Sequence, residues 1–126
     1  MLWFWIFMLL VVLLTPIIMI IFGYIFMKKT SIAINDFFGY RSKRSMKNNK
    51  TWAYAHQYIG KLWLIIGIVI LPLSVIPLIF VWEGGYDTIG LVAVAIVIIQ
   101  TIPITVSIIM TELALKRKFD DFGDPR

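Results

Sequence analysis

The sequence predicts an all-α membrane protein with three transmembrane helices. Three long apolar runs, at about residues 2–27, 58–81 and 89–111, each reach the roughly 20 helical residues that cross a bilayer core. The composition agrees, because 60% of the residues are hydrophobic and 15% are charged, whereas soluble domains carry about 25% charged residues. We expect one membrane domain covering residues 1–126.

The first run predicts a retained helix, because residues 2–27 carry no charge. A signal peptide would begin with a basic segment, have a shorter apolar core and end at a small-residue cleavage site. This run shows none of these features. Pro16 and Gly23 are the positions at which we expect the helix to bend.

The second helix is expected to begin before its apolar run, near Trp52, with Thr51 as its N-cap. About thirty helical residues reach roughly 45 Å, so its first turns should extend beyond the hydrocarbon. Pro72 and Pro77 are expected to break or kink its outer half. The third helix should continue into the charged tail, residues 112–126, for about two turns.

The distribution of cations predicts the topology. All twelve Lys and Arg residues fall on one side, in the basic loop 28–51, in the tail, or at Lys61 beside the loop. The N-terminus and the turn at residues 82–88 carry none. The positive-inside rule therefore predicts that the N-terminus lies outside and the C-terminus in the cytoplasm. We expect the basic loop to contact anionic lipid headgroups and not nucleic acid.

One face of the second helix gathers aromatic and small residues within a sector of roughly 80°. Its small residues recur every seven positions, which suits close approach of a neighbouring helix. We interpret the face as a packing seam. The alternative is that its cytoplasmic end opens into a pocket lined by Trp52, His56 and Trp63. The whole face consists of Trp52, His56, Gly60, Trp63, Gly67 and Ser74.

The third helix carries two polar stripes about 100° apart. Polar residues inside a span normally face the interior of the bundle, because lipid cannot satisfy them. Glu112, at the cytoplasmic end, is expected to pair with His56, Arg41 or Lys61, the alternative being an ordinary solvated carboxylate. One stripe holds Thr101, Thr105, Ile108 and Glu112, and the other holds Gln100, Ser107 and Thr111.

Enzymatic and metal chemistry is poorly represented in this sequence. One histidine, one nearby acid and no cysteine are too few ligands for a tetrahedral zinc site. Ser42 and Ser45 lack the setting of an activated nucleophile. We therefore predict no enzyme, no metal and no cofactor. A lone histidine such as His56 can act as a pH switch or proton relay, although it is more often a hydrogen-bonding residue.

The stretch from Asn35 to Gly60 separates the first two spans. Its first part suggests an interfacial turn, in which Gly39 permits a positive φ. Arg41 and Arg44 would then face phosphates or carboxylates. Its residues follow the pattern Asn-x-x-x-Gly-aromatic-Arg-Ser and then Trp-x-x-x-His-x-x-x-Gly, carried by Asn35, Gly39, Tyr40, Arg41, Ser42, Trp52, His56 and Gly60.

This pattern resembles the signature of the SdpI family of small bacterial membrane proteins, whose namesake is the immunity protein against the sporulation-delay peptide toxin. The resemblance implies a multi-pass protein of the bacterial cytoplasmic membrane that confers immunity to, or senses, a membrane-active peptide. Its partner would be that peptide or a cytoplasmic regulator. To the signature residues we add Arg44, Trp63 and Glu112 as the candidate recognition site.

Two other functions stay open on the sequence alone. One is a homo-oligomeric component that binds lipid or carries out proton-coupled transport of small solutes, with Glu112 and His56 relaying protons. The other is an enzyme acting on a lipid headgroup, which lacks a recognisable nucleophile.

Overall fold

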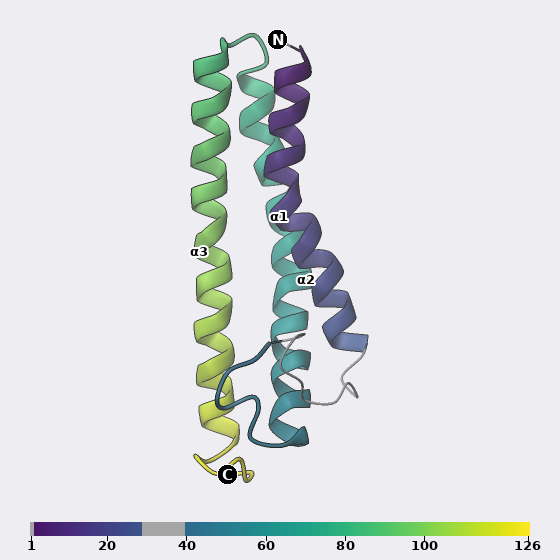
Figure 1. Ribbon diagram of the computed structural model, residues 1–126, viewed down its shortest axis with the longest axis vertical. Coiled ribbons are helices and arrows are strands. Elements are labelled where there is room, and N and C mark those ends of the chain that lie inside the picture. Colours follow the sequence, from purple (N-terminus) through teal and green to yellow (C-terminus); the bar gives the residue numbers. More distant parts are fainter. Residues whose placement is uncertain (1, 29–39) are drawn as a thin grey trace.

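The chain forms three helices that lie side by side, each antiparallel to the one before it in the sequence (Figure 1). The computed structural model describes residues 2–28 and 40–126. Its helices are α1 (Leu2–Lys28), α2 (Asn49–Phe80) and α3 (Tyr86–Lys118). All three are long and apolar enough to cross a membrane, which confirms the predicted fold class. The N-terminus lies at the same end as the α2–α3 turn, and the C-terminus lies at the opposite end (Figure 1).

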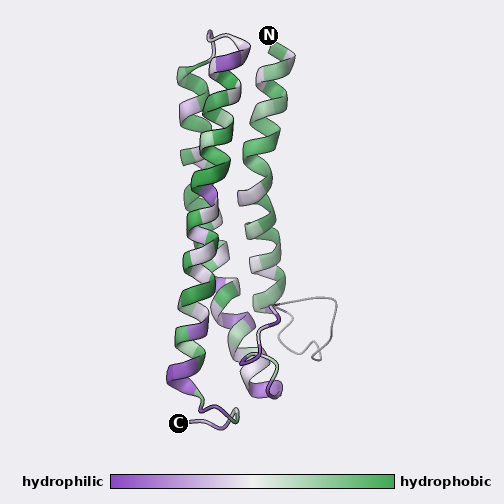
Figure 2. Cartoon of the chain, turned by 60° about the vertical axis from the view of Figure 1, so that its left-hand side comes forward, coloured by the Kyte–Doolittle hydropathy of each residue, from purple (hydrophilic) through white to green (hydrophobic). Residues whose placement is uncertain are grey.

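Hydrophobic residues cover most of the length of the bundle, while hydrophilic residues gather at the end that holds the C-terminus (Figure 2). We call this the basic end and define it as residues 40–58 and 112–126. Both α2 and α3 exceed 30 residues, and at about 1.5 Å per residue each is longer than a bilayer core of roughly 30 Å. The ends of these helices therefore extend past the hydrocarbon and carry the polar residues.

Helix α2 begins earlier than predicted. Its N-cap is Asn48, whose side chain accepts from the Thr51 backbone N–H at 2.9 Å, while the Thr51 hydroxyl accepts from the Asn48 N–H at 3.0 Å. The prediction of Thr51 as N-cap was therefore wrong, because Thr51 is the third helical residue of a reciprocal capping box. Pro72 and Pro77, where a break or a kink was expected, do not break the helix, since α2 continues to Phe80.

The predicted seam on α2 is a close contact with α1. A Cβ atom on Gly60 would lie 2.8 Å from the Gly23 carbonyl oxygen, and one on Gly23 would lie 2.7 Å from the Gly60 carbonyl oxygen. Seven residues further along α2, a Cβ on Gly67 would lie 2.9 Å from the Pro16 carbonyl oxygen. Glycine at these positions lets the two backbones touch, as small residues do between membrane helices.

A polar contact joins all three helices within the apolar part of the bundle. Pro16 has no N–H, so the Val12 carbonyl lacks its usual intrahelical donor. The Gln100 side chain of α3 supplies the missing bond, donating from Nε2 to the Val12 oxygen at 2.8 Å and to the Ser74 hydroxyl of α2 at 2.7 Å. Helix α1 changes direction near its middle (Figure 1), where this proline lies.

The two polar stripes of α3 face different ways. Gln100, Ser107 and Thr111 are buried, as predicted for polar residues in a span. Thr101 and Thr105 are exposed, and their hydroxyls donate to carbonyls of their own helix at 2.6 and 3.0 Å. Because a threonine can satisfy its hydroxyl within its own helix, Thr101 and Thr105 do not have to face the interior of the bundle.

The C-terminal tail folds back on the basic end. The Asn48 side-chain amide donates to the Gly123 carbonyl at 2.7 Å, and Gly123 has a positive φ of 86°. Arg126 donates from Nε to the Lys116 and Phe119 carbonyls at 2.8 and 3.0 Å. The bond to Lys116 satisfies one carbonyl in the last turn of α3, and the bond from Asn48 places the tail beside the start of α2.

Candidate functional site

A compact turn positions the described part of the signature. Ser45 is fully buried, and its hydroxyl donates toward the Tyr40 carbonyl while accepting from the Ser42 N–H at 2.9 Å. The Ser42 hydroxyl in turn accepts from the Ser45 N–H at 3.1 Å. Thr51 ties the turn to α2 by donating to the Ser45 carbonyl at 3.0 Å. The backbone around Tyr40 is therefore held in one position relative to α2.

His56 of α2 holds this turn in place through a hydrogen bond. Its Nε2 accepts from the backbone N–H of Tyr40 at 2.9 Å, and its Nδ1 lies 2.8 Å from the Trp52 carbonyl oxygen. A carbonyl can only accept, so Nδ1 carries the proton and the imidazole is neutral. The ring is packed between Trp52, at 4.2 Å between centroids, and Phe26, at 5.0 Å. Both ring nitrogens are thus occupied by backbone groups.

Glu112 meets the turn from the other side. Its carboxylate accepts a hydrogen bond from the Tyr40 hydroxyl. Burial raises the pKa of Tyr40 above its ordinary value, and the bond to Glu112 raises it further, so this hydroxyl stays protonated and keeps donating. The predicted pairing of Glu112 with His56, Arg41 or Lys61 was wrong. Tyr40 stands between Glu112 and His56 and contacts each through a different group.

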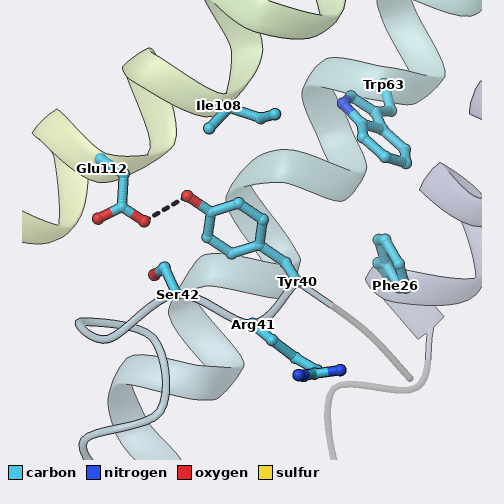
Figure 3. Close-up of a pocket in the computed structure, with 7 residues that line it drawn as sticks. All are labelled: Phe26, Tyr40, Arg41, Ser42, Trp63, Ile108 and Glu112. Atoms are coloured by element: carbon cyan, nitrogen blue, oxygen red, sulfur yellow. Dashed lines mark hydrogen bonds between the residues drawn. The ribbon is translucent and has the colours of Figure 1, made fainter. Parts of the chain in front are cut away.

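A cavity of about 420 Å³ lies beside this bond, between the turn and the three helices. Tyr40 and Glu112 form one side of it, while Trp63 and Phe26 form the other (Figure 3). Its volume falls in the range of about 300–1,000 Å³ that is common for ligand sites. The lining residues are Phe26, Tyr40, Arg41, Ser42, Trp63, Ile108 and Glu112.

The two arginines of the turn have different surroundings. Arg44 is bound to Asp121 of the tail at 3.0 Å, so it does not contribute to the cavity. Arg41 is exposed and lines the cavity, and its side chain points away from Glu112 (Figure 3). Within residues 2–28 and 40–126, its guanidinium makes no hydrogen bond or ion pair. Among the described residues, Arg41 is therefore an unpaired cation at the rim of a largely apolar cavity.

The remaining predicted residues that the structure describes lie near the cavity but, except for Trp63, do not line it. Trp52 and His56 are 2% and 4% exposed and do not line it, and Gly60 is the contact point with α1. The pocket predicted from Trp52, His56 and Trp63 thus contains only Trp63, which donates from Nε1 to the Ser107 hydroxyl at 2.9 Å. Asn35 and Gly39 lie outside the described residues.

Sequence reasoning missed two contributors to the site. Phe26 lines the cavity from α1, and no pattern in an apolar run distinguishes it from its neighbours. Ser45 holds the turn, and it had been considered only as a nucleophile. Its spacing of three from Ser42 matches a reciprocal hydroxyl–amide pair, which is the signal that could have identified it.

Residues 31–111 match the family model described as the SdpI/YfhL protein family. This range contains the whole signature, the cavity residues of α2 and α3 except Glu112, and most of both helices. No curated protein and no solved structure matches the chain.

Proposed function

This chain belongs to the SdpI/YfhL protein family, and we propose that it confers immunity to, or senses, a membrane-active peptide through the cavity at its basic end. The observation that carries the proposal is the arrangement of the signature residues. Tyr40, Arg41 and Ser42 line a cavity of suitable size, while Trp52 and His56 hold the turn that presents them.

The cavity suits an amphipathic ligand. Its apolar wall, formed by Phe26, Trp63 and Ile108, would receive hydrophobic side chains of a peptide lying in the membrane. The free Arg41 would bind a carboxylate of the peptide, for which the planar guanidinium is well suited. Because no carboxylate among the described residues neutralises Arg41, the peptide would supply the missing charge.

We further propose that the basic end faces the cytoplasm of a bacterium. Lys43, Lys47 and Lys50 are exposed there, and juxtamembrane cations of this kind contribute about 1 kcal/mol each toward an anionic membrane surface. The sequence supports this orientation, because all twelve Lys and Arg residues fall in or beside the segments on one side of the three spans. A homo-oligomer stays a prediction. The alternative proton relay would need Glu112 and His56 in contact, whereas Tyr40 separates them.

The test is protection of a host that is sensitive to the sporulation-delay toxin and lacks its own immunity gene. We expect the wild-type chain to protect, and Arg41→Ala to lose protection at equal membrane abundance. Lys43→Ala is the matched control, because it removes one exposed cation of the same turn that does not line the cavity. Absence of protection by the wild type against related toxins, or equal loss in both variants, would count against the proposal.

A further inference from the structure

A second cavity, far from the basic end, has an unusual chemical character. It has a volume of about 180 Å³ and lies between α2 and α3, within the apolar spans. Leu73 and Ile99 on its rim are 57% and 61% exposed, so the cavity opens toward the lipid-facing surface. Its lining residues are Ile70, Leu73, Ser74, Pro77, Ile96, Ile99, Gln100 and Pro103.

One buried polar atom of a residue that lines this cavity has no partner in the described part of the chain. Gln100 is 4% exposed, and its Oε1 makes no hydrogen bond to any residue that the structure describes. The orientation of the amide is set by chemistry, because the Val12 carbonyl can only accept and must therefore face Nε2. Oε1 is left over, and an unpaired acceptor in an apolar interior is unfavourable by about 1–3 kcal/mol.

Two backbone acceptors lie at the same cavity. Pro77 and Pro103 have no N–H, so the carbonyls of Leu73 and Ile99, four residues earlier in each helix, lack their usual donors. Both residues line the cavity. The two helices thus bring proline-freed carbonyls to one place from opposite sides.

The donors around the cavity are already committed. Both N–H groups of the Gln100 amide are used, toward Val12 and Ser74, and the Ser74 hydroxyl donates to the Ile70 carbonyl at 2.7 Å. The polar groups of this site therefore offer acceptors only. An occupant must donate a hydrogen bond, and no charged residue lines the cavity to neutralise an ion.

We propose that this cavity binds a small, neutral, lipid-soluble molecule that carries a hydroxyl group on an apolar body. The hydroxyl would donate to the Leu73 or Ile99 carbonyl, each freed by a proline of the lining, while the body packs against Ile70, Ile96 and the rim. The volume is below the roughly 300–1,000 Å³ of sites for drug-sized ligands, so the site takes a short aliphatic alcohol or the hydroxyl end of a longer one. This binding does not depend on toxin recognition at the basic end.

The test is photolabelling of the full chain in phosphatidylcholine vesicles with two diazirine probes, 3-azioctanol and an eight-carbon azialkane without the hydroxyl. We expect the alcohol to label residues of the cavity about twofold to tenfold more than the alkane, which is the ratio that one net hydrogen bond gives. Labelled residues are identified by mass spectrometry of peptides.

Variants distinguish a specific site from general partition into lipid. Ile99→Trp should obstruct the rim and abolish the preferred labelling, whereas Leu91→Trp, an equally large change at a 73% exposed position of α3 outside the lining, should leave it unchanged. In a Pro77→Ala/Pro103→Ala double variant that remains folded by circular dichroism, the restored N–H groups occupy both carbonyls, so the two probes should label alike. Equal labelling of the wild type by both probes, as an apolar or merely hydrated cleft would give, overturns the proposal, as does labelling spread evenly over lipid-facing residues.

Discussion

Tyr40 connects two parts of the basic end through two chemically different groups. Its backbone N–H donates to His56 of α2 at 2.9 Å, and its side-chain hydroxyl donates to Glu112 of α3. The first bond requires a neutral imidazole that accepts at Nε2, and the second requires a protonated phenol. The two contacts of this one residue, which also lines the cavity, thus depend on the protonation state of two groups.

Removing only the hydroxyl tests the second bond. Tyr40→Phe is expected to lower the free energy of unfolding by about 1.5–3 kcal/mol, the range for a hydrogen bond to a charged group, because Glu112 then loses its donor. Unfolding in detergent with increasing denaturant measures the change. Tyr58→Phe is the control, since Tyr58 is half-buried and its hydroxyl has no partner among the described residues.

The same bond predicts a dependence on alkaline pH. Burial and Glu112 raise the pKa of Tyr40 above its ordinary value of 10.0, so above about pH 10 the unfolded chain loses a proton that the folded chain keeps. Stability contributed by Tyr40 is complete below that pH and decreases as pH rises toward the folded-state pKa. We expect the stability difference between wild type and Tyr40→Phe to shrink from pH 9 to pH 11. A difference that stays constant across this range would contradict the account.

At the scale of elements, the α1–α2 contact depends on the absence of side chains. The Gly23 and Gly60 backbones approach so closely that a methyl group on either would overlap a carbonyl oxygen of the other. This contact also places Phe26 of α1 against His56 and Trp63, at 5.0 and 5.9 Å between ring centroids. The apolar wall of the cavity is therefore set by the crossing point of the two helices.

Adding one methyl group tests this crossing. Gly60→Ala is expected to destabilise the protein by about 1–3 kcal/mol, as overpacking does, because its Cβ would meet the Gly23 oxygen at 2.8 Å. Gly90→Ala makes the same chemical change where the nearest atom, of Phe4, is 3.8 Å away. It should be neutral or slightly stabilising, since alanine favours helix by up to about 1 kcal/mol. Similar melting temperatures for both variants would show that the contact is not tight.

The start of α2 has a second role in holding the tail. Asn48 caps the helix with its oxygen and binds the Gly123 carbonyl with its nitrogen. Asn48→Asp keeps the capping oxygen and removes the donor, so we expect faster hydrogen exchange in residues 119–126 with the start of α2 still protected. Hydrogen-exchange mass spectrometry measures both regions, with Asn49→Asp at the exposed neighbouring position as control. Loss of protection in α2 itself would show that the two roles cannot be separated.

At the scale of the whole molecule, Gln100 is where three helices share one polar contact. The proline in α1 frees a carbonyl, a glutamine in α3 binds it, and a serine in α2 receives the second N–H. At the end of the bundle away from the basic end, Trp5 joins α1 to α2 by donating from Nε1 to the Leu78 carbonyl at 2.8 Å. Polar groups inside the membrane thus specify how apolar helices, which lipid solvates equally well, pack against one another.

Replacing Gln100 tests the importance of this contact. Gln100→Leu is expected to lower the free energy of unfolding by about 1–3 kcal/mol, because the Val12 carbonyl and the Ser74 hydroxyl both lose a buried donor. Thr101→Val is the matched control, since the Thr101 hydroxyl is exposed and bonds its own helix. It should change stability by less than about 0.5 kcal/mol. Stability equal to wild type in Gln100→Leu would mean that neighbouring protein groups or a buried water satisfy the freed carbonyl.

Much of the site could be predicted because helical spacing is regular. Trp52, His56 and Gly60 share a face by periodicity alone, and the structure buries all three on it. The partner of Glu112 could not be predicted, because the sequence brings three cationic or titratable candidates to the same depth without ordering them. Asn48 and Thr51 were confused because each residue of a reciprocal capping box can be interpreted as the cap.

The sequence by itself determined the number of spans and the distribution of charge between the two ends. Both depend on composition along the chain, since about 20 apolar residues span a bilayer core whatever their neighbours are. Only the tertiary structure decided that Tyr40 reaches Glu112, that Arg41 lines a cavity without a partner among the described residues, and that Gln100 faces a proline-freed carbonyl. These outcomes depend on how the helices are rotated and where they cross. The small residues of α2 indicated a face for close approach, but not which helix would lie there or at what angle.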